Sequence, residues 1–175
     1  MSGLRIPVGP DDHVLGDLHA PVVLLEYGDY QCPYCAAAQP VIGDILRDFG
    51  DRIAFVFRNF PLSDDHPEAI PAAVTAEYAG NHGRFWEAHD ALYANQDVLG
   101  DALYEQIASD LGLSVAGLQD AMADDTYLER IQHDFAGGVR SGVNGTPCFF
   151  INGRRYDAVD GAEGLYGDIE ALLGD

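Results

Sequence analysis

The pattern of apolar and polar positions divides the chain into two strand-rich ends and a helical middle. Two continuous apolar runs, over residues 21–26 (PVVLLE) and 53–57 (IAFVF), have the length and β-branched content of buried strands. Between them, apolar residues recur at helical spacing over residues 36–49, and Gly50 ends that pattern. This order predicts a βαβ unit with a right-handed crossover and parallel strands.

The middle of the chain, residues 66–141, has an almost entirely helical pattern. It predicts helices over residues 67–80, 84–95, 101–111 and 126–140, and a short helix that begins after Ser114.

Strand signals return near the end of the chain. Residues 148–151 and 154–158 flank Asn152-Gly153, a dipeptide typical of a type I′ hairpin turn, and a last helix is predicted over residues 162–173. The fold class is therefore α/β, in the order βαβ, helical block, ββα. We expect one domain from residues 1–62 and 142–175, interrupted by a helical insertion over residues 63–141.

The charge balance narrows the function classes. The formal net charge is −20, from 21 Asp, 8 Glu and 9 Arg with no Lys. Phosphate backbones repel such a surface, so nucleic-acid binding is not expected. The acidity fits either a need for solubility or adaptation to a salty environment that screens like charges.

Membrane and export signals are not apparent. No run of about 18 apolar residues occurs, so no membrane span and no membrane partner are expected. Residues 1–12 hold one Arg and no apolar stretch of the kind found in a signal peptide, which favours a cytoplasmic location.

Two of the three cysteines form a Cys32-Pro33-Tyr34-Cys35 motif. A zinc site would normally need a second pair of Cys or His at similar spacing, and neither the remaining Cys148 nor the six histidines provide one. The pair instead follows a predicted strand and opens a predicted helix, where free N–H groups and the helix dipole stabilise a thiolate. We therefore predict Cys32 as nucleophile and leaving group and Cys35 as the more buried resolving thiol, against the alternative of two incidental cysteines.

Glu26 ends the first predicted strand, six residues before Cys32. A carboxyl group buried beneath the pair would have a raised pKa and could take the proton from Cys35 when that thiol attacks a mixed disulfide. The alternative is an acid at a strand end that points to water.

Four segments of the chain resemble the DsbA-like branch of the thioredoxin superfamily. They are APVVLLEYGDYQCPYC (20–35), FRNFPL (57–62), FWEAHDALYANQ (85–96) and GVNGTPCFFINGRRY (142–156). With the order of the predicted strands and helices, the resemblance extends over nearly the whole chain. The resemblance implies a thioredoxin fold with a helical insertion and a thiol–disulfide oxidoreductase that works through a mixed disulfide.

The resemblance also assigns roles to residues. Cys32 matches the exposed attacking cysteine, Cys35 the resolving cysteine and Glu26 the buried acid. Thr146 and Pro147 match the cis-proline loop that packs against the pair, and the Thr146 backbone would pair with an extended substrate segment.

The dipeptide completes the predicted substrate contacts. Pro33 suits the first helical position. Tyr34, together with Tyr27 and Tyr30, is interpreted either as an apolar rim for unfolded substrates or as local packing around the pair. The family's periplasmic oxidants carry a histidine in this dipeptide, so Pro33-Tyr34 predicts a less oxidising pair. Without an export signal, reductase, isomerase or peroxide-linked roles are favoured in a reducing cytosol.

Cys148 follows Pro147, where the family more usually has Thr, Ala or Ser. It is interpreted either as a small buried hydrophobe or as a third redox- or metal-capable thiol near the pair.

The expected partners are protein or peptide thiols and disulfides, together with a redox partner such as a thioredoxin-like protein or glutathione. No cofactor is expected. Two other functions stay open from sequence: a metal-binding or metallochaperone module using Cys32, Cys35 and Cys148, and a glutathione-dependent transferase that would not need both cysteines of the pair.

Overall fold

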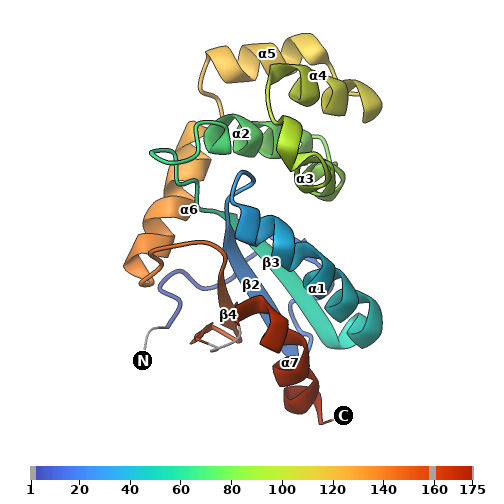
Figure 1. The fold of residues 1–175 in the computed structure, drawn as a ribbon, viewed down its shortest axis with the longest axis vertical. Coiled ribbons are helices and arrows are strands. Elements are labelled where there is room, and N and C mark those ends of the chain that lie inside the picture. Colours follow the sequence, from blue (N-terminus) through green and yellow to red (C-terminus); the bar gives the residue numbers. More distant parts are fainter. Residues whose placement is uncertain (1–2, 158–160, 175) are drawn as a thin grey trace.

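A five-stranded mixed sheet forms the centre of the molecule in the computed structural model, which describes residues 3–157 and 161–174 (Figure 1). The strand order is β1-β3-β2-β4-β5, in which β2 and β3 are parallel and every other neighbouring pair is antiparallel. The strands are β1 (His13–Leu15), β2 (Val22–Gly28), β3 (Ile53–Asn59), β4 (Cys148–Ile151) and β5 (Arg154–Tyr156). Helix α1 (Pro33–Phe49) connects β2 to β3, which confirms the predicted α/β class and the βαβ unit.

The remaining helices lie close to their predicted positions. They are α2 (Ala69–Gly80), α3 (Phe85–Ala94), α4 (Asp101–Asp110), α5 (Val115–Ala123), α6 (Leu128–Arg140) and α7 (Leu165–Leu173), with short 3₁₀ turns at Gly50–Arg52, Gln96–Val98 and Gly161–Gly164. Figure 1 shows α2 to α5 gathered at one end of the sheet, whereas α6 runs back beside it toward β4. The Ser114 hydroxyl accepts a hydrogen bond from Gly117 N and so caps α5 as expected.

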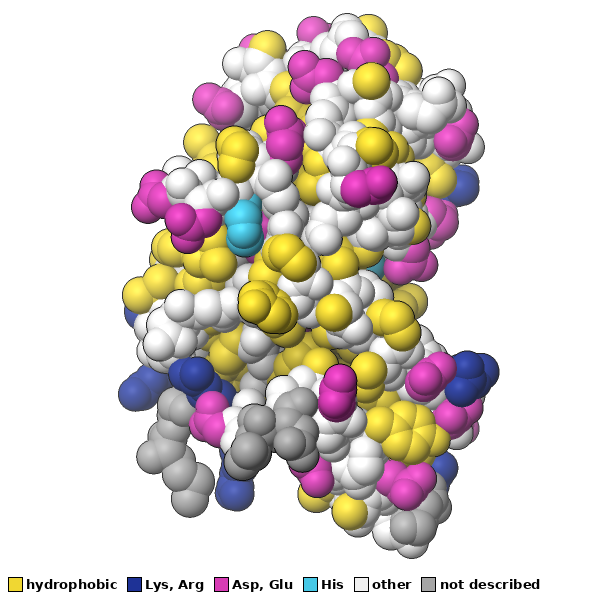
Figure 2. All heavy atoms as spheres, in the orientation of Figure 1, with side chains coloured by type: hydrophobic (Ala, Val, Ile, Leu, Met, Phe, Trp, Pro, Cys, Tyr) yellow, Lys and Arg dark blue, Asp and Glu magenta, His cyan; other side chains and the backbone are white. Residues whose placement is uncertain are grey.

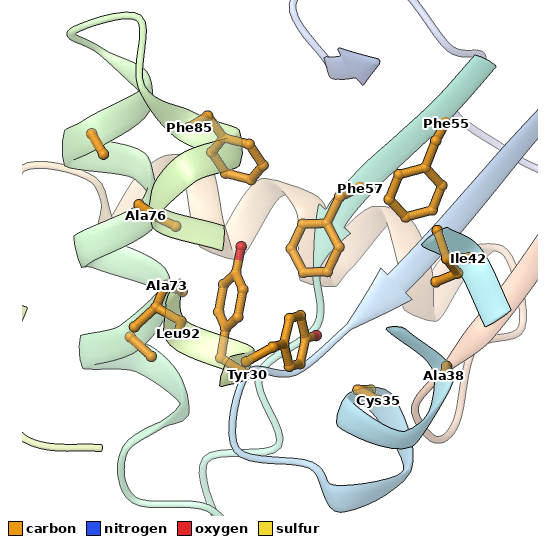
Figure 3. Packing of buried hydrophobic residues seen from close by; sticks show 14 of the residues in the cluster. Tyr30, Cys35, Ala38, Ile42, Phe55, Phe57, Ala73, Ala76, Phe85 and Leu92 are labelled. Atoms are coloured by element: carbon orange, nitrogen blue, oxygen red, sulfur yellow. The ribbon is translucent and has the colours of Figure 1, made fainter. Parts of the chain in front are cut away.

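Alternation along the strands sorts side chains onto two faces of the sheet. In β2, Leu24 packs into the larger hydrophobic cluster together with α1, and Leu25 packs into a smaller cluster on the other face. The larger cluster is continuous from α1 to the insertion. In Figure 3, Phe57 and Tyr30 lie between the side chains of α1 and those of α2 and α3, so insertion and sheet share one core.

The structure corrects three strand predictions, one of which is β3, which extends two residues beyond its predicted end to Asn59. β1 was not predicted, because its three residues are half-buried and gain their hydrogen bonds from β3 rather than from any local pattern. β2 extends to Gly28, two residues beyond the predicted end, because Tyr27 and Gly28 still pair with neighbouring strands. Glu26 is therefore inside the strand and not at its end.

The predicted hairpin turn between β4 and β5 is present. Asn152 and Gly153 have φ values of +50° and +80°, as a type I′ turn requires. Ala158, the last residue of the predicted second strand, lies outside the described residues. Among the residues that are described, no helix has the length and apolar character needed to cross a bilayer.

Candidate active site

The cysteine pair occupies the first turn of α1. Cys32 is the N-cap residue and Pro33 takes the first helical position. An N–H group at that position has no hydrogen-bond partner within the helix, so proline, which lacks the N–H, fits there without loss of a hydrogen bond. The Cys32 carbonyl accepts hydrogen bonds from Cys35 N (3.1 Å) and Ala36 N (3.2 Å), which sets the two cysteines one turn apart.

Both thiols are reduced, and they differ in burial. Cys35 is fully buried, and 3% of Cys32 is exposed. The order agrees with the prediction, but Cys32 is much less exposed than the family resemblance implies. The reason is the loop before β4, whose Thr146 carbonyl oxygen lies 3.5 Å from Cys32 Sγ.

The two thiols have opposite pKa shifts. The pKa of Cys32 is lowered to about 5, chiefly by a hydrogen bond from the Cys35 thiol and further by the backbone N–H groups of Cys35 and Tyr34, while burial opposes the shift. The pKa of Cys35 is raised by burial, by its donation to Cys32 and by the charge of Glu26. At neutral pH the pair is therefore one thiolate and one thiol.

Glu26 lies beneath the pair on the α1 face of the sheet, since it follows Leu24 by two residues along β2 and therefore points to the same face. It is fully buried, and neither carboxylate oxygen has a hydrogen-bond partner in the part of the chain that the structure describes. Burial raises its pKa to about 8, and the nearby charge of Cys32 adds to the effect. A Cβ on Gly28 would stand 2.9 Å from Glu26 Oε1, so the close approach here requires glycine. The burial predicted for Glu26 is therefore observed.

The loop before β4 contributes Thr146 and Pro147, and the peptide bond between them is cis. Its contact with Cys32 brings together two segments that are 114 residues apart in sequence.

A groove of about 590 Å³ begins beside this loop. Ala37 and Val41 of α1 line one side, Pro147 and Tyr156 line the other, and Tyr34 stands at the groove with 75% of its surface exposed. Figure 2 shows hydrophobic side chains gathered across the middle of this face, over the start of α1. The groove has both apolar and polar lining residues and begins at the loop that contacts Cys32, and the substrate contacts of Pro33, Tyr34 and Thr146 stay predictions.

Comparison with known proteins identifies the family. The protein-family model described as "Thioredoxin" matches residues 9–171. The chain belongs to the thioredoxin family.

Solved structures of DsbA-like proteins have the same fold as this thioredoxin-family chain. BdbD from Bacillus subtilis superposes with a TM-score of 0.81 at 22% identity, covering 93% of this chain and 92% of that one. Alpha-DsbA1 from Wolbachia pipientis gives a TM-score of 0.81 at 22% identity, with 98% and 94% covered. A thioredoxin-like oxidoreductase from Silicibacter pomeroyi gives 0.79 at 24% identity, with 95% of each chain covered. The fold is thus a DsbA-like thioredoxin fold.

Curated relatives match the chain over only part of their own length. The Na⁺/H⁺ antiporter NhaA 1 of Salinispora arenicola is 45% identical over 170 residues, which is 97% of this chain and 25% of the relative. NhaA 3 of Salinispora tropica is 42% identical over 163 residues, covering 93% and 25%. The thioredoxin-family chain spans about a quarter of the length of these relatives.

Cys148 lies apart from the thioredoxin-type pair. It packs into the smaller cluster with Leu25 and Phe150, on the face of the sheet opposite α1, and burial raises its pKa. Within residues 3–157 and 161–174, no three His, Cys, Asp or Glu side chains come together as a metal-binding group. The apolar surroundings and burial support the interpretation of Cys148 as a small buried hydrophobe, and the alternative of a third redox-capable thiol near the pair stays a prediction.

Three polar residues around the pair were missed by the sequence analysis. Gln96 Nε2 donates to the carbonyl oxygens of Tyr30 (2.8 Å) and Cys32 (2.9 Å). Asp29 is buried and its carboxylate accepts from His66 Nδ1 at 2.7 Å. A turn at Asp29, in which Oδ1 accepts from the backbone N of Gln31, is the one local signal that could have drawn attention to it. The partners of Gln96 and His66 depend on how the insertion packs.

Proposed function

We propose that the chain is a thiol–disulfide oxidoreductase that exchanges disulfides with protein or peptide substrates through Cys32 and Cys35. The observation that supports this most directly is the placement of Cys32 as the N-cap of α1, with Cys35 one turn behind it and the Thr146 carbonyl oxygen of the cis-proline loop 3.5 Å from Cys32 Sγ. The lowered pKa of Cys32 and the raised pKa of Cys35 agree with this geometry. A stabilised thiolate is the attacking and leaving group of disulfide exchange, and a buried thiol held beside it is suited to resolve the intermediate.

In the first step the Cys32 thiolate attacks one sulfur of a substrate disulfide. A Cys32–substrate disulfide forms, the substrate S–S bond breaks, and the second substrate sulfur leaves as a thiolate that takes a proton from solvent. One disulfide has replaced another at this stage, and the two-electron reduction of the substrate is complete only after the second step.

In the second step Cys35 attacks Cys32 Sγ. A Cys32–Cys35 disulfide forms, the mixed disulfide breaks, and the remaining substrate sulfur leaves as a thiolate. Cys35 must lose its proton first, and Glu26 is the acceptor. Once Cys32 is in a mixed disulfide its charge is gone, and so is one of the two causes that raise the Glu26 pKa. Glu26 therefore becomes a carboxylate more readily at the step that needs a base. The two steps in reverse oxidise a substrate dithiol.

Substrate binding is assigned to the surface beside the pair. Thr146 offers backbone groups next to Cys32 Sγ for pairing with an extended segment, Tyr34 borders the groove, and Pro33 lies between Cys32 and Tyr34 at the start of α1. Because so little of Cys32 is exposed, a substrate has to fit closely against the loop at Thr146 to reach the sulfur.

The redox partner is proposed to be a thioredoxin-like protein or glutathione, and the location cytoplasmic. The names of the curated relatives describe much longer proteins, and for this chain we propose the redox activity alone.

Reduction of insulin by dithiothreitol tests the proposal, with turbidity as the readout. The wild-type chain should accelerate precipitation and Cys32→Ser should not. Cys35→Ser should stall as a mixed disulfide that mass spectrometry detects. A glutathione-dependent transferase would instead keep its activity in Cys35→Ser. A wild-type chain that is folded yet inactive with every thiol reductant would refute the proposal.

The direction of electron flow follows from the reduction potential of the Cys32–Cys35 couple, measured against glutathione. A value near −270 mV would indicate a reductant like thioredoxin, and one near about −120 mV an oxidant like DsbA.

A further inference from the structure

Asp29 has a buried carboxylate, and its backbone groups contact both cysteines. Its carbonyl oxygen accepts from Cys32 N at 3.1 Å, and its own N–H faces the Cys35 sulfur. Its side chain is fully shielded from solvent, and it accepts from Gln31 N on one oxygen and from Leu62 N on the other. A negative charge held this close to Cys32 disfavours a thiolate there, because two like charges in a poorly solvated site repel each other.

His66 is the counter-charge to this carboxylate. It comes from the segment that leads into α2, and its Nδ1 lies 2.7 Å from Asp29 Oδ2 with 22% of the side chain exposed. The charged groups that face it are Asp29 and Cys32 from the loop before α1 and Asp65 from its own segment. All three are acidic, so the site favours the protonated imidazole.

We propose that His66 is a positioning residue whose protonation sets the charge beside Cys32, so that His66 and the Cys32 thiolate stabilise each other through Asp29. The proposal rests on the proposed function and adds a pH-sensitive control to the same site. Protonated His66 offsets the Asp29 carboxylate and favours the Cys32 thiolate. When His66 loses its proton, the uncompensated carboxylate disfavours the thiolate and hence the reduced pair.

The coupling must be reciprocal, because two binding equilibria that affect each other do so by the same factor. Reduction of the pair replaces a neutral sulfur at Cys32 with a negative one. The pKa of His66 should therefore be higher in the reduced protein than in the oxidised protein. His66 has the raised pKa that this arrangement predicts, with the hydrogen bond to Asp29 as its largest cause and the charge of Cys32 among the others.

The direct test is an NMR titration of the His66 imidazole in the wild-type protein, once with the pair reduced and once with the pair as a disulfide. The His66 signal is assigned by its loss in His66→Gln. We expect the pKa to be about half a unit higher in the reduced protein, the size of effect that a charge at this range has in a partly solvated site. Equal His66 pKa values in the two redox states would overturn the proposal.

Two variants at position 66 test whether the charge of His66 or only its packing affects the Cys32 pKa. The readout is the Cys32 pKa, followed as thiolate absorbance at 240 nm in the reduced protein. His66→Gln should raise this pKa by about half a unit, and the equilibrium between the pair and glutathione should move about threefold toward the disulfide. His66→Arg keeps a positive charge and a donor for Asp29, so it should leave the Cys32 pKa low. If Gln and Arg raise the Cys32 pKa equally, the role of His66 is structural and the proposal fails.

His133→Gln is the matched control, since His133 is an exposed residue on α6. It should leave the Cys32 pKa unchanged. Neither measurement uses a protein substrate, so failure of the insulin assay and failure of this inference are separate results.

Discussion

The buried position of Glu26 makes the free energy of unfolding depend on pH. Its carboxylate is fully buried, neither oxygen has a hydrogen-bond partner among the described residues, and burial raises its pKa from the usual 4.5 to about 8. Between these two values the unfolded chain has lost the Glu26 proton and the folded chain has kept it. The folded state thus loses stability relative to the unfolded state as the pH rises from about 4.5 to 8, by on the order of 5 kcal/mol.

Glu26→Gln should remove this pH dependence. The variant should be as stable as the wild type near pH 5 and more stable near pH 9, because a neutral amide has no charge to desolvate. Urea unfolding of the oxidised protein at pH 5, 7 and 9 measures the difference without titration of the thiols. Glu129→Gln, a change at an exposed glutamate, is the control. Equal pH profiles for Glu26→Gln and wild type would contradict a buried, protonated Glu26.

Cys148 should be dispensable for exchange. It lies on the opposite face of the sheet from the pair, within an apolar cluster. Cys148→Ala should leave the rate of insulin reduction unchanged and cost about 1 kcal/mol of stability, because it removes one buried atom.

Mass spectrometry gives a second test of the isolation of Cys148. In a Cys35→Ala variant, mild oxidation should give no disulfide between Cys32 and Cys148, whereas the wild type should form the Cys32–Cys35 bridge under the same conditions. A Cys32–Cys148 bridge in the folded variant would show that the two sulfurs meet.

At the scale of elements, the short turn after α3 holds the loop that carries the nucleophile. Gln96 is the first residue of that turn, and its amide donates to two carbonyl oxygens on the loop, those of Tyr30 and Cys32. The insertion therefore contacts the loop at Cys32 in two ways, through these two hydrogen bonds from Gln96 and through the shared hydrophobic core.

Gln96→Ala should remove both hydrogen bonds to the loop at Tyr30 and Cys32. Two partly buried carbonyl groups would lose a donor, for which we expect about 1–2 kcal/mol of lost stability and a slower exchange reaction. Gln106→Ala is the control, because Gln106 donates only to the exposed Asp110 on its own helix. Urea unfolding and the rate of Cys32 alkylation measure the two effects. Equal changes in both variants would show that Gln96 has no special role.

The distance in sequence between contacting residues explains which parts of the site the sequence could predict and which it could not. The strand, the cysteine pair and α1 lie within residues 22–49, and local spacing was enough to place Cys32 on the first turn and Glu26 below it. The contacts of Gln96 and His66 with the loop join residues 64 and 37 positions apart. They depend on the packing of the insertion, which hydrophobic periodicity does not encode. The face taken by Cys148 was decided by the register of β4 against β2, and this too is a tertiary property.

For the whole molecule, the dominant physical feature is the imbalance of charge. The chain carries 29 acidic residues against 9 arginines, and Figure 2 shows acidic side chains spread over the visible face around its apolar middle. Several arginines are engaged in specific ion pairs, such as Arg58 with Asp12, and do not lie free to offset the remaining acids. Repulsion among the acids disfavours the compact state, and it acts over distances that salt can screen.

Salt should therefore stabilise this protein at neutral pH. We expect the Tm at pH 7 to rise by about 5 °C between roughly 20 mM and 500 mM NaCl, with most of the rise below 200 mM, where the Debye length falls fastest. Near pH 4.2, the isoelectric point that the sequence gives, the net charge vanishes and the same addition of salt should change the Tm little. Differential scanning calorimetry at both pH values tests the effect. A Tm that rises linearly with salt and equally at both pH values would instead indicate exclusion of salt from the protein surface. A fall in Tm at pH 7 would mean that local ion pairs such as Arg47 with Asp44 outweigh the net repulsion.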